Sequence, residues 1–178
     1  MVQSRKEVWQ EICNEIRQGN AHILITGSRG SGKTTLLERL LKEDMLPGGE
    51  QAGIRSFALR NGDGTPSQII LEDRSDGQQQ AIAEGFVPGR GPKVKAEVLD
   101  HFGVQAIEHS KSASGCWAVI DEVGFLENAS PAYCRALLRL FDQKRVAAVL
   151  RKKDTALIGV IRSRTDAVCF DLDDFEKE

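Results

Sequence analysis

Residues 21–41 read AHILITGSRGSGKTTLLERLL, and this stretch decides the fold. The apolar, β-rich run at 21–26 is typical of a buried strand in a parallel sheet. Residues 27–33 predict a glycine-rich turn. The inner face of a following helix is marked by leucines at helical spacing: Leu36, Leu37, Leu40 and Leu41. A strand, a glycine loop and an amphipathic helix therefore follow one another directly.

The glycine-rich turn matches a phosphate-binding pattern in full. Residues 27–34 read Gly-Ser-Arg-Gly-Ser-Gly-Lys-Thr, which fits G-x-x-x-x-G-K-[ST]. The loop must curl its backbone N–H groups around phosphate oxygens, and side chains at the glycines would obstruct that curl. Lys33 is expected to contact the β- and γ-phosphates, and Thr34 to offer its hydroxyl to Mg²⁺. The predicted nucleotide-binding residues are Gly27, Ser28, Arg29, Gly30, Ser31, Gly32, Lys33, Thr34 and Thr35.

A second apolar run ends in two acids. Residues 117–120 predict another buried strand, and Asp121 and Glu122 follow it at once. We expect Asp121 to hold Mg²⁺ opposite Thr34, either directly or through a water molecule bound to the ion. Glu122 can reach the water that faces the γ-phosphate and orient or deprotonate it. Glu122 and Lys33 are therefore the predicted catalytic residues, and Glu122 favours hydrolysis over transfer to another phosphate.

The remaining pattern alternates strands with helices, which predicts an α/β fold with a mainly parallel sheet flanked by helices. A turn signal at 61–64 lies between two strand-like runs, and this arrangement predicts a β-hairpin. Ser130 and Pro131 predict a helix start, and Asp154 a cap for a short helix. The other elements are expected at 1–19 and 94–107 as helices, and at 54–59, 68–71, 146–150 and 167–170 as strands.

Two segments show no clear period. Residues 73–92 are rich in Gly, Gln and Pro and predict a mobile loop, which is either a lid over the nucleotide or a surface insertion. The acidic tail at 171–178 is expected to be solvated or frayed.

Composition limits the other classes of function. The 178 residues fit a single domain, 1–178, and 40% are hydrophobic. A net charge of −2 is evidence against non-specific nucleic-acid binding. The sequence has no membrane-length apolar run and no secretory signal. The four cysteines are scattered, which predicts buried thiols in a reducing, cytoplasmic compartment.

Several features together resemble a known family, the small P-loop nucleoside-triphosphatases related to nucleotide kinases. Gly53 and Arg60 keep the family's spacing after the P-loop, and residues 121–127 read Asp-Glu-Val-Gly-Phe-Leu-Glu. A strand like 146–151 followed by basic residues, and Ile-Arg-Ser-Arg at 161–164 before an apolar strand, complete the resemblance. It covers residues 21–170, and its distinctive parts are the P-loop and 121–127.

The resemblance implies a three-layer, RecA-like P-loop NTPase fold, Mg²⁺-dependent hydrolysis and a permissive choice of base. By position, Asp121 becomes the Walker B acid, Glu122 the catalytic carboxylate and Glu127 a further acid of the family motif. This chain departs from the family at Phe125, where a lysine is usual, and at Arg151, where a histidine is typical.

Arginine candidates and alternative functions remain open. Arg60, Arg151 and Arg29 are each able to neutralise charge that develops on the γ-phosphate. Trp117 and Phe125 are candidates for stacking on a base, although core positions are the commoner use of such aromatics. The leading function is hydrolysis of ATP, GTP or another triphosphate. One alternative is a nucleotide or small-molecule kinase, and the other is a slow nucleotide-switch adaptor with a protein partner.

Overall fold

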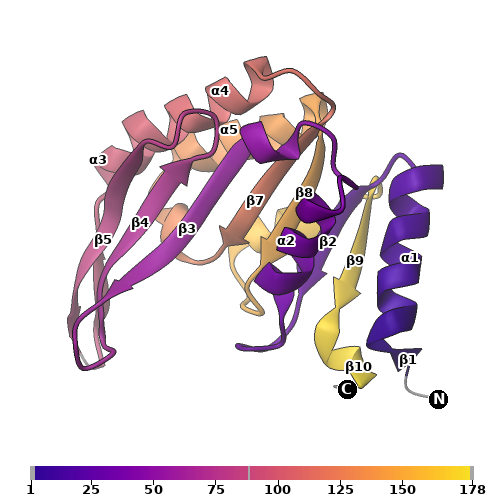
Figure 1. The fold of residues 1–178 in the computed structure, drawn as a ribbon. Helices are drawn as coiled ribbons and strands as arrows, with labels where there is room; N and C mark the ends of the chain where they lie inside the picture. Colours follow the sequence, from indigo (N-terminus) through magenta and orange to yellow (C-terminus); the bar gives the residue numbers. More distant parts are fainter. Residues whose placement is uncertain (1–2, 88, 177–178) are drawn as a thin grey trace.

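The computed structural model describes residues 3–87 and 89–176 (Figure 1). Its centre is an eight-stranded sheet with the strand order β6-β5-β4-β3-β7-β8-β2-β9. A separate two-stranded sheet joins β1 (Gln3–Ser4) to β10 (Phe175–Glu176). The strands of the large sheet are β2 (His22–Thr26), β3 (Gly53–Arg60), β4 (Pro66–Asp73), β5 (Gln79–Val87), β6 (Gly91–Val94), β7 (Trp117–Val123), β8 (Arg145–Leu150) and β9 (Ala167–Asp171).

The large sheet has a parallel part and an antiparallel part. Strands β3, β7, β8, β2 and β9 pair in parallel, whereas β3, β4, β5 and β6 pair as an antiparallel meander. The predicted α/β fold with a mainly parallel sheet is therefore confirmed, and so is the hairpin, which is formed by β3 and β4. In Figure 1 the meander projects to the lower left, away from the helices at the right.

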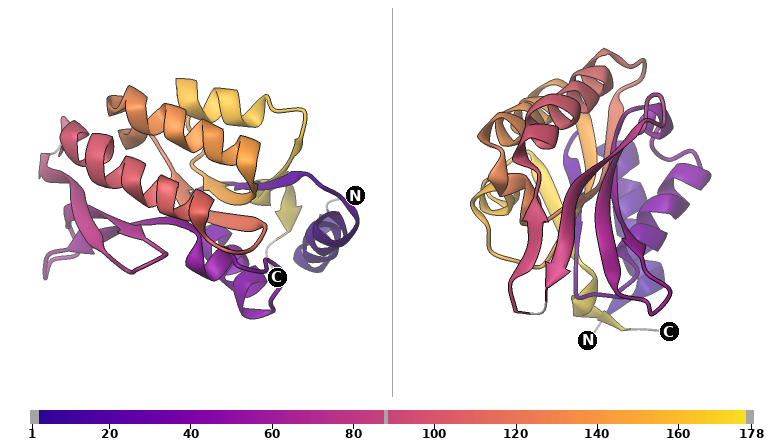
Figure 2. Two further views of the ribbon diagram at one scale, coloured as in Figure 1. Left: turned by 90° about the horizontal axis from the view of Figure 1, so that it is seen from above. Right: turned by 90° about the vertical axis from the view of Figure 1, so that its left-hand side faces the viewer.

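Helices cover both faces of the sheet (Figure 2). On one face lie α1 (Arg5–Gln18) and α2 (Lys33–Lys42), and on the other α3 (Ala96–Val98), α4 (Val104–Ser112), α5 (Pro131–Gln143) and α6 (Ala156–Arg162). The π-helical turn η2 (Leu99–Gly103) joins α3 to α4. Short 3-10 helices are η1 (Gly49–Gln51), η3 (Leu126–Ala129) and η4 (Leu172–Asp174).

The alternation of buried strand residues produces two apolar cores. In β2, Ile23 and Ile25 pack into the core under α1 and α2, while Leu24 packs into the core under α4, α5 and α6. Successive side chains of a strand point to opposite faces, so a strand buried on both faces reads as a continuous apolar run. This explains why the run at 21–26 predicts its strand correctly.

Local signals define the helix ends. Ser4 and Glu7 form the capping box of α1, and the Ser130 hydroxyl accepts a hydrogen bond from the Tyr133 N–H at the start of α5. The cap of α6 is Thr155, not Asp154 as predicted. The two candidates are adjacent, and only Thr155 places its side-chain oxygen on the Ile158 N–H.

Gly53 is required where β3 meets β7. Its φ is +122°, and a Cβ built there would lie 1.8 Å from the carbonyl oxygen of Val119. Any larger residue would push the two strands apart, which explains the glycine at this position.

Two expectations from the sequence are wrong. The segment 73–92 is not an irregular loop, because most of it forms β5 and the start of β6. The tail is not simply solvated over the described residues 171–176, where Leu172 is buried and η4 packs beside the P-loop.

The cysteines also differ from expectation, since Cys13 is buried but Cys116 and Cys169 are exposed. Within residues 3–87 and 89–176, no helix combines the length and apolarity that a membrane crossing requires.

Candidate active site

The five parallel strands end at one edge of the sheet, the lower edge in Figure 1, and four of them lead directly into candidate site residues. The P-loop follows β2, and Asp121 and Glu122 lie at the end of β7. Arg151 follows β8, and η4 follows β9. Since carboxyl ends of parallel strands meet at one edge, residues distant in the sequence are brought together there.

The P-loop leads directly into α2. Gly32 is the N-cap of this helix with φ +93°, a left-handed conformation that favours glycine. Lys33 begins the helix and folds back over the loop, where its Nζ donates to the carbonyl oxygens of Gly27 (2.9 Å) and Ser28 (2.8 Å). The lysine ammonium and the positive end of α2 therefore face the same concave loop, an arrangement suited to an anion.

Thr34 and Asp121 meet across 87 residues of sequence. The Thr34 hydroxyl donates to Oδ1 of Asp121 at 3.2 Å, which places two hard oxygen donors side by side. Burial raises the pKa of Asp121, while the hydrogen bond from Thr34 counteracts that rise. A hydroxyl and a carboxylate are the ligand types that Mg²⁺ accepts in proteins, so the residues present fit this ion.

Glu122 is held by Arg151. The Arg151 guanidinium forms an ion pair with the Glu122 carboxylate, whose side chain is 22% exposed. The same guanidinium lies 5.9 Å from the ring centroid of Phe125. Glu122, a predicted catalytic residue, thus lies next to the positive charge of Arg151, one residue beyond Asp121.

Glu127 lies inside the protein, at 4% exposure. Its Oε2 accepts a hydrogen bond from the Gly124 N–H at 3.0 Å, which stabilises the turn after β7. Burial raises the pKa of Glu127, with hydrogen bonds to backbone N–H groups acting in the opposite direction. The geometry therefore gives Glu127 a part in supporting the turn.

A cleft of about 840 Å³ contains the P-loop and extends past Glu122 to the meander. This size falls within the usual range of ligand sites, roughly 300–1,000 Å³. Arg29 and Arg60 both line the cleft and are exposed. The Arg60 Nη1 donates to the Gly64 carbonyl oxygen at 2.8 Å, within the β3–β4 turn. Of the three candidate arginines, Arg151 is the one that contacts a predicted catalytic group.

The two aromatic candidates for stacking on a base differ in their exposure. Trp117 is a core residue, at 2% exposure, with the Arg145 guanidinium 4.1 Å from its ring centroid. Phe125 is 37% exposed and lines the cleft.

The acidic tail supplies contacts that the sequence analysis missed. Asp173 accepts hydrogen bonds from both the N–H and the hydroxyl of Ser28, each at 2.8 Å. Lys152, which follows β8, bridges Asp171 at 2.9 Å and Asp173 at 3.0 Å. The signal was the position of the acids directly after a strand, because a parallel strand next to β2 must end beside the P-loop.

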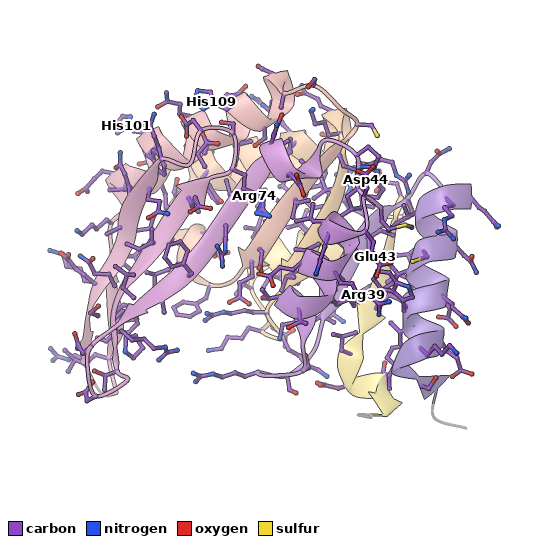
Figure 3. The ribbon with its side chains drawn as sticks, viewed as in Figure 1. Arg39, Glu43, Asp44, Arg74, His101 and His109 are labelled. Carbon is purple, nitrogen blue, oxygen red and sulfur yellow. The ribbon has the colours of Figure 1, made fainter. Side chains whose placement is uncertain are left out.

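Arginines from the meander also contribute to the site. Arg55 lies opposite Asp121 in the β3–β7 register, and both Arg55 and Arg74 lower the pKa of Asp121. Burial lowers the pKa of the Arg74 guanidinium, and Figure 3 labels this side chain near the upper part of β3. Arg74 follows the end of β4, inside the segment that was predicted as a loop, so no periodic pattern pointed to it.

Comparison with known proteins agrees with this geometry. The chain matches the family model described as NTPase over residues 22–178. The nucleoside-triphosphatase THEP1 of Thermotoga sp. (strain RQ2) is 28% identical over 167 residues, which cover 85% of this chain and 86% of that protein. THEP1 of Methanothermobacter thermautotrophicus is 31% identical over 158 residues, with 85% and 86% covered.

Solved structures share the fold. THEP1 from Aquifex aeolicus superposes with a TM-score of 0.66 at 21% identity, covering 85% of this chain and 89% of that one. A human cancer-related nucleoside triphosphatase gives 0.62 at 22% identity, with 85% and 88% covered. Because the family model matches nearly the whole chain and the P-loop edge has the geometry described above, this chain belongs to the NTPase family.

Proposed function

We propose that this chain is a Mg²⁺-dependent nucleoside-triphosphatase that releases the γ-phosphate of its substrate to water. The observation that carries the proposal is the contact of Thr34 with Asp121 at 3.2 Å, with Glu122 next in the chain. This contact joins the phosphate-binding loop to the acidic strand end. The names of the THEP1 relatives, nucleoside-triphosphatases, support the same activity.

Two groups of residues orient the triphosphate: the P-loop with Lys33, and the pair Thr34 and Asp121. The P-loop N–H groups cradle the α- and β-phosphates, and Lys33 reaches the β- and γ-phosphates, as this motif requires. Thr34 and Asp121 would hold Mg²⁺, which when bound offsets negative charge on the phosphate oxygens. The γ-phosphate therefore points toward the end of β7, and the nucleoside lies at the opposite end of the triphosphate.

Glu122 orients the attacking water. Glu122 lines the cleft that contains the P-loop, where its carboxylate can accept a hydrogen bond from water and then its proton. In the structure this carboxylate is paired with Arg151. We infer that Arg151 positions Glu122 and lies near the phosphoryl group, where a guanidinium can stabilise developing charge.

The experiment that tests this proposal measures the rate of phosphate release by the Glu122→Gln variant. We expect the turnover rate to fall by roughly 10²–10⁴-fold, the usual contribution of a general base. Affinity for a non-hydrolysable analogue should stay within about twofold, because the P-loop is untouched. Glu97→Gln, an exposed glutamate outside the cleft, is the matched control. Addition of EDTA should abolish turnover in the unmodified chain.

Full turnover in Glu122→Gln would reject the role of this residue. Full turnover in EDTA would reject the magnesium dependence. A panel of ATP, GTP, CTP and UTP in the same assay determines the base preference.

A further inference from the structure

The cleft extends beyond the triphosphate site into a second half, which lies along the meander. The strand order β2-β8-β7-β3-β4-β5-β6 leads from the P-loop past Glu122 to the meander. Since β4 and β6 run antiparallel to β3 and β5, their first residues reach the same edge as the last residues of β3 and β5. The meander therefore extends the edge that carries the P-loop.

The wall formed by the meander is apolar. Ala58 of β3 and Ile69 of β4 are register partners, and both line the cleft. Pro66, Phe86 and Pro92 line it from β4, β5 and β6, and all three are only partly covered. Phe125, after β7, adds an exposed ring to the same cleft. We call this half, defined by Ala58, Pro66, Ile69, Phe86, Pro92 and Phe125, the outer chamber.

The phosphate groups of a bound triphosphate make no favourable contact with an apolar wall. Phosphate oxygens bind N–H groups and cations, which the P-loop and Lys33 supply. If the γ-phosphate points toward Glu122, as the proposed function requires, the nucleoside lies on the far side of the P-loop. The outer chamber is then beyond the γ-phosphate, on the side from which the nucleophile approaches.

The cleft also has more positive charge than one triphosphate explains. Six basic and one acidic residue are among its described lining residues. Lys33 belongs to the phosphate loop, Arg151 is paired with Glu122, and Lys152 with Asp171 and Asp173. Near the outer chamber, Lys153 places its Nζ 5.0 Å from the ring centroid of Phe125, and Arg60 ends β3. Flat apolar rings and cations thus occur together.

We propose that the outer chamber binds a second small ligand of the nucleoside-monophosphate class, next to the bound triphosphate. The rings of Phe86 and Phe125 can stack on an aromatic base, and such stacking depends little on which base it is. A phosphate group matches Arg60 and Lys153. The proposal rests on the proposed function for the direction of the triphosphate, and it adds a ligand site to that function.

Occupation of the outer chamber has a kinetic consequence. The ligand lies on the side from which water attacks, so it restricts the access of water to the γ-phosphate. Saturating monophosphate should therefore lower phosphate release from the bound triphosphate.

The test is a calorimetric titration of the full chain, saturated with Mg²⁺ and a β,γ-imido triphosphate analogue. The titrants are AMP, GMP, CMP and UMP, with the corresponding nucleosides as probes of the phosphate contact. We expect saturable binding of at least one monophosphate, and at least tenfold weaker binding of its nucleoside. Phe86→Ala should weaken this binding by roughly 5–100-fold, the usual effect of losing one stacking partner.

The matched control is Phe57→Ala. Phe57 pairs with Ile70, and the neighbouring pair, Ala58 and Ile69, lines the cleft. Because successive side chains of a strand point to opposite faces, Phe57 lies on the face of the meander that is turned away from the cleft. Its loss should leave monophosphate binding within twofold. The affinity of the triphosphate analogue, measured in both variants, reports whether the P-loop site is intact.

Three results would overturn the proposal: no saturable binding by any of the four monophosphates, equal weakening by the two phenylalanine variants, or monophosphate binding that disappears once the analogue is present. The last result would mean that the monophosphate uses the P-loop itself. Because the titration needs no turnover, these failures are distinct from failure of the Glu122→Gln test.

Discussion

Asp121 and Glu122 are adjacent in the chain but lie in different surroundings. Asp121 is buried, at 7% exposure, and accepts a hydrogen bond from Thr34. Glu122 is half-buried and paired with Arg151. The difference fits two separate tasks, because a metal ligand needs a fixed position, whereas a base needs access to water.

Glu127 provides a prediction at the residue scale. Its side chain is buried and accepts the Gly124 N–H, so Glu127→Ala should leave this donor without a partner and destabilise the fold by roughly 1–3 kcal/mol. Glu127→Gln keeps an acceptor oxygen and should lose less. Urea unfolding of both variants measures the difference. Equal stability of Glu127→Ala and the unmodified chain would show that the turn after β7 does not need this contact.

The sequence predicts some residues of the site better than others, for a physical reason. The P-loop and Asp121 are recognisable because their chemistry requires particular residues at fixed spacing next to a buried strand. The support that Glu127 gives to Gly124, and the approach of Arg55 and Arg74 to Asp121, depend on how distant segments pack. No spacing rule contains that information, so these contacts needed the structure.

At the scale of elements, the end of β9 matters as much as the strand itself. Strand β9 lies next to β2, and η4 then brings Asp173 against Ser28. The carboxylate binds both the N–H and the hydroxyl of Ser28, and Lys152 neutralises its charge. These contacts lower the pKa of Asp173 far below its usual range, so the carboxylate remains ionised at neutral pH. We infer that this short segment fixes the first part of the P-loop.

Asp173→Ala tests this inference. Removing the acceptor releases Ser28, while Lys152 keeps its ion pair with Asp171. We expect affinity for a triphosphate analogue to fall roughly fivefold to tenfold as the loop loses order. The rate at saturating substrate should change less, because Glu122 and Asp121 are not touched. Asp174→Ala, which alters the exposed neighbour, is the control. If both variants bind the analogue alike, the tail does not position the P-loop.

The meander shows where pattern analysis fails. Strand β5 is exposed at many positions, and its pairing with β4 shifts register between Ile69 and Ile70. A second shift, between Glu84 and Val87, disturbs its pairing with β6. Such irregularities break the alternation of apolar and polar residues, which is the signal that predicts a strand. The buried strands β2 and β8 keep continuous apolar runs and were predicted to within one residue at each end, whereas β7, predicted at 117–120, extends three residues further through Asp121 and Glu122 to Val123.

At the scale of the whole molecule, the two edges of the parallel sheet differ in character. The carboxyl edge carries the P-loop and the acids, while the opposite edge holds a buried histidine. His22, at the start of β2, is 4% exposed and accepts a hydrogen bond from the Val146 N–H through Nδ1 at 3.0 Å. Its ring packs edge-on against Phe141, with centroids 5.0 Å apart. This histidine therefore links two central strands to α5.

The state of His22 makes stability depend on pH. Burial lowers the pKa of its imidazole, although the nearby Asp166 carboxylate acts in the opposite direction. The unfolded chain, with a histidine pKa near 6.5, then binds more protons than the folded chain in weakly acidic solution. Folding stability should consequently fall as the pH drops below about 6.5, and the loss should level off below the folded-state pKa.

His22→Asn isolates this contribution, because the amide oxygen can replace Nδ1 as an acceptor without gaining a charge. The variant should be less stable at every pH, since it loses the contact with Phe141. Between pH 7 and pH 5, however, its free energy of unfolding should decline less than that of the unmodified chain. His101→Gln, at an exposed position labelled in Figure 3, should keep the original slope. Parallel slopes for His22→Asn and the unmodified chain would mean that another group controls acid sensitivity.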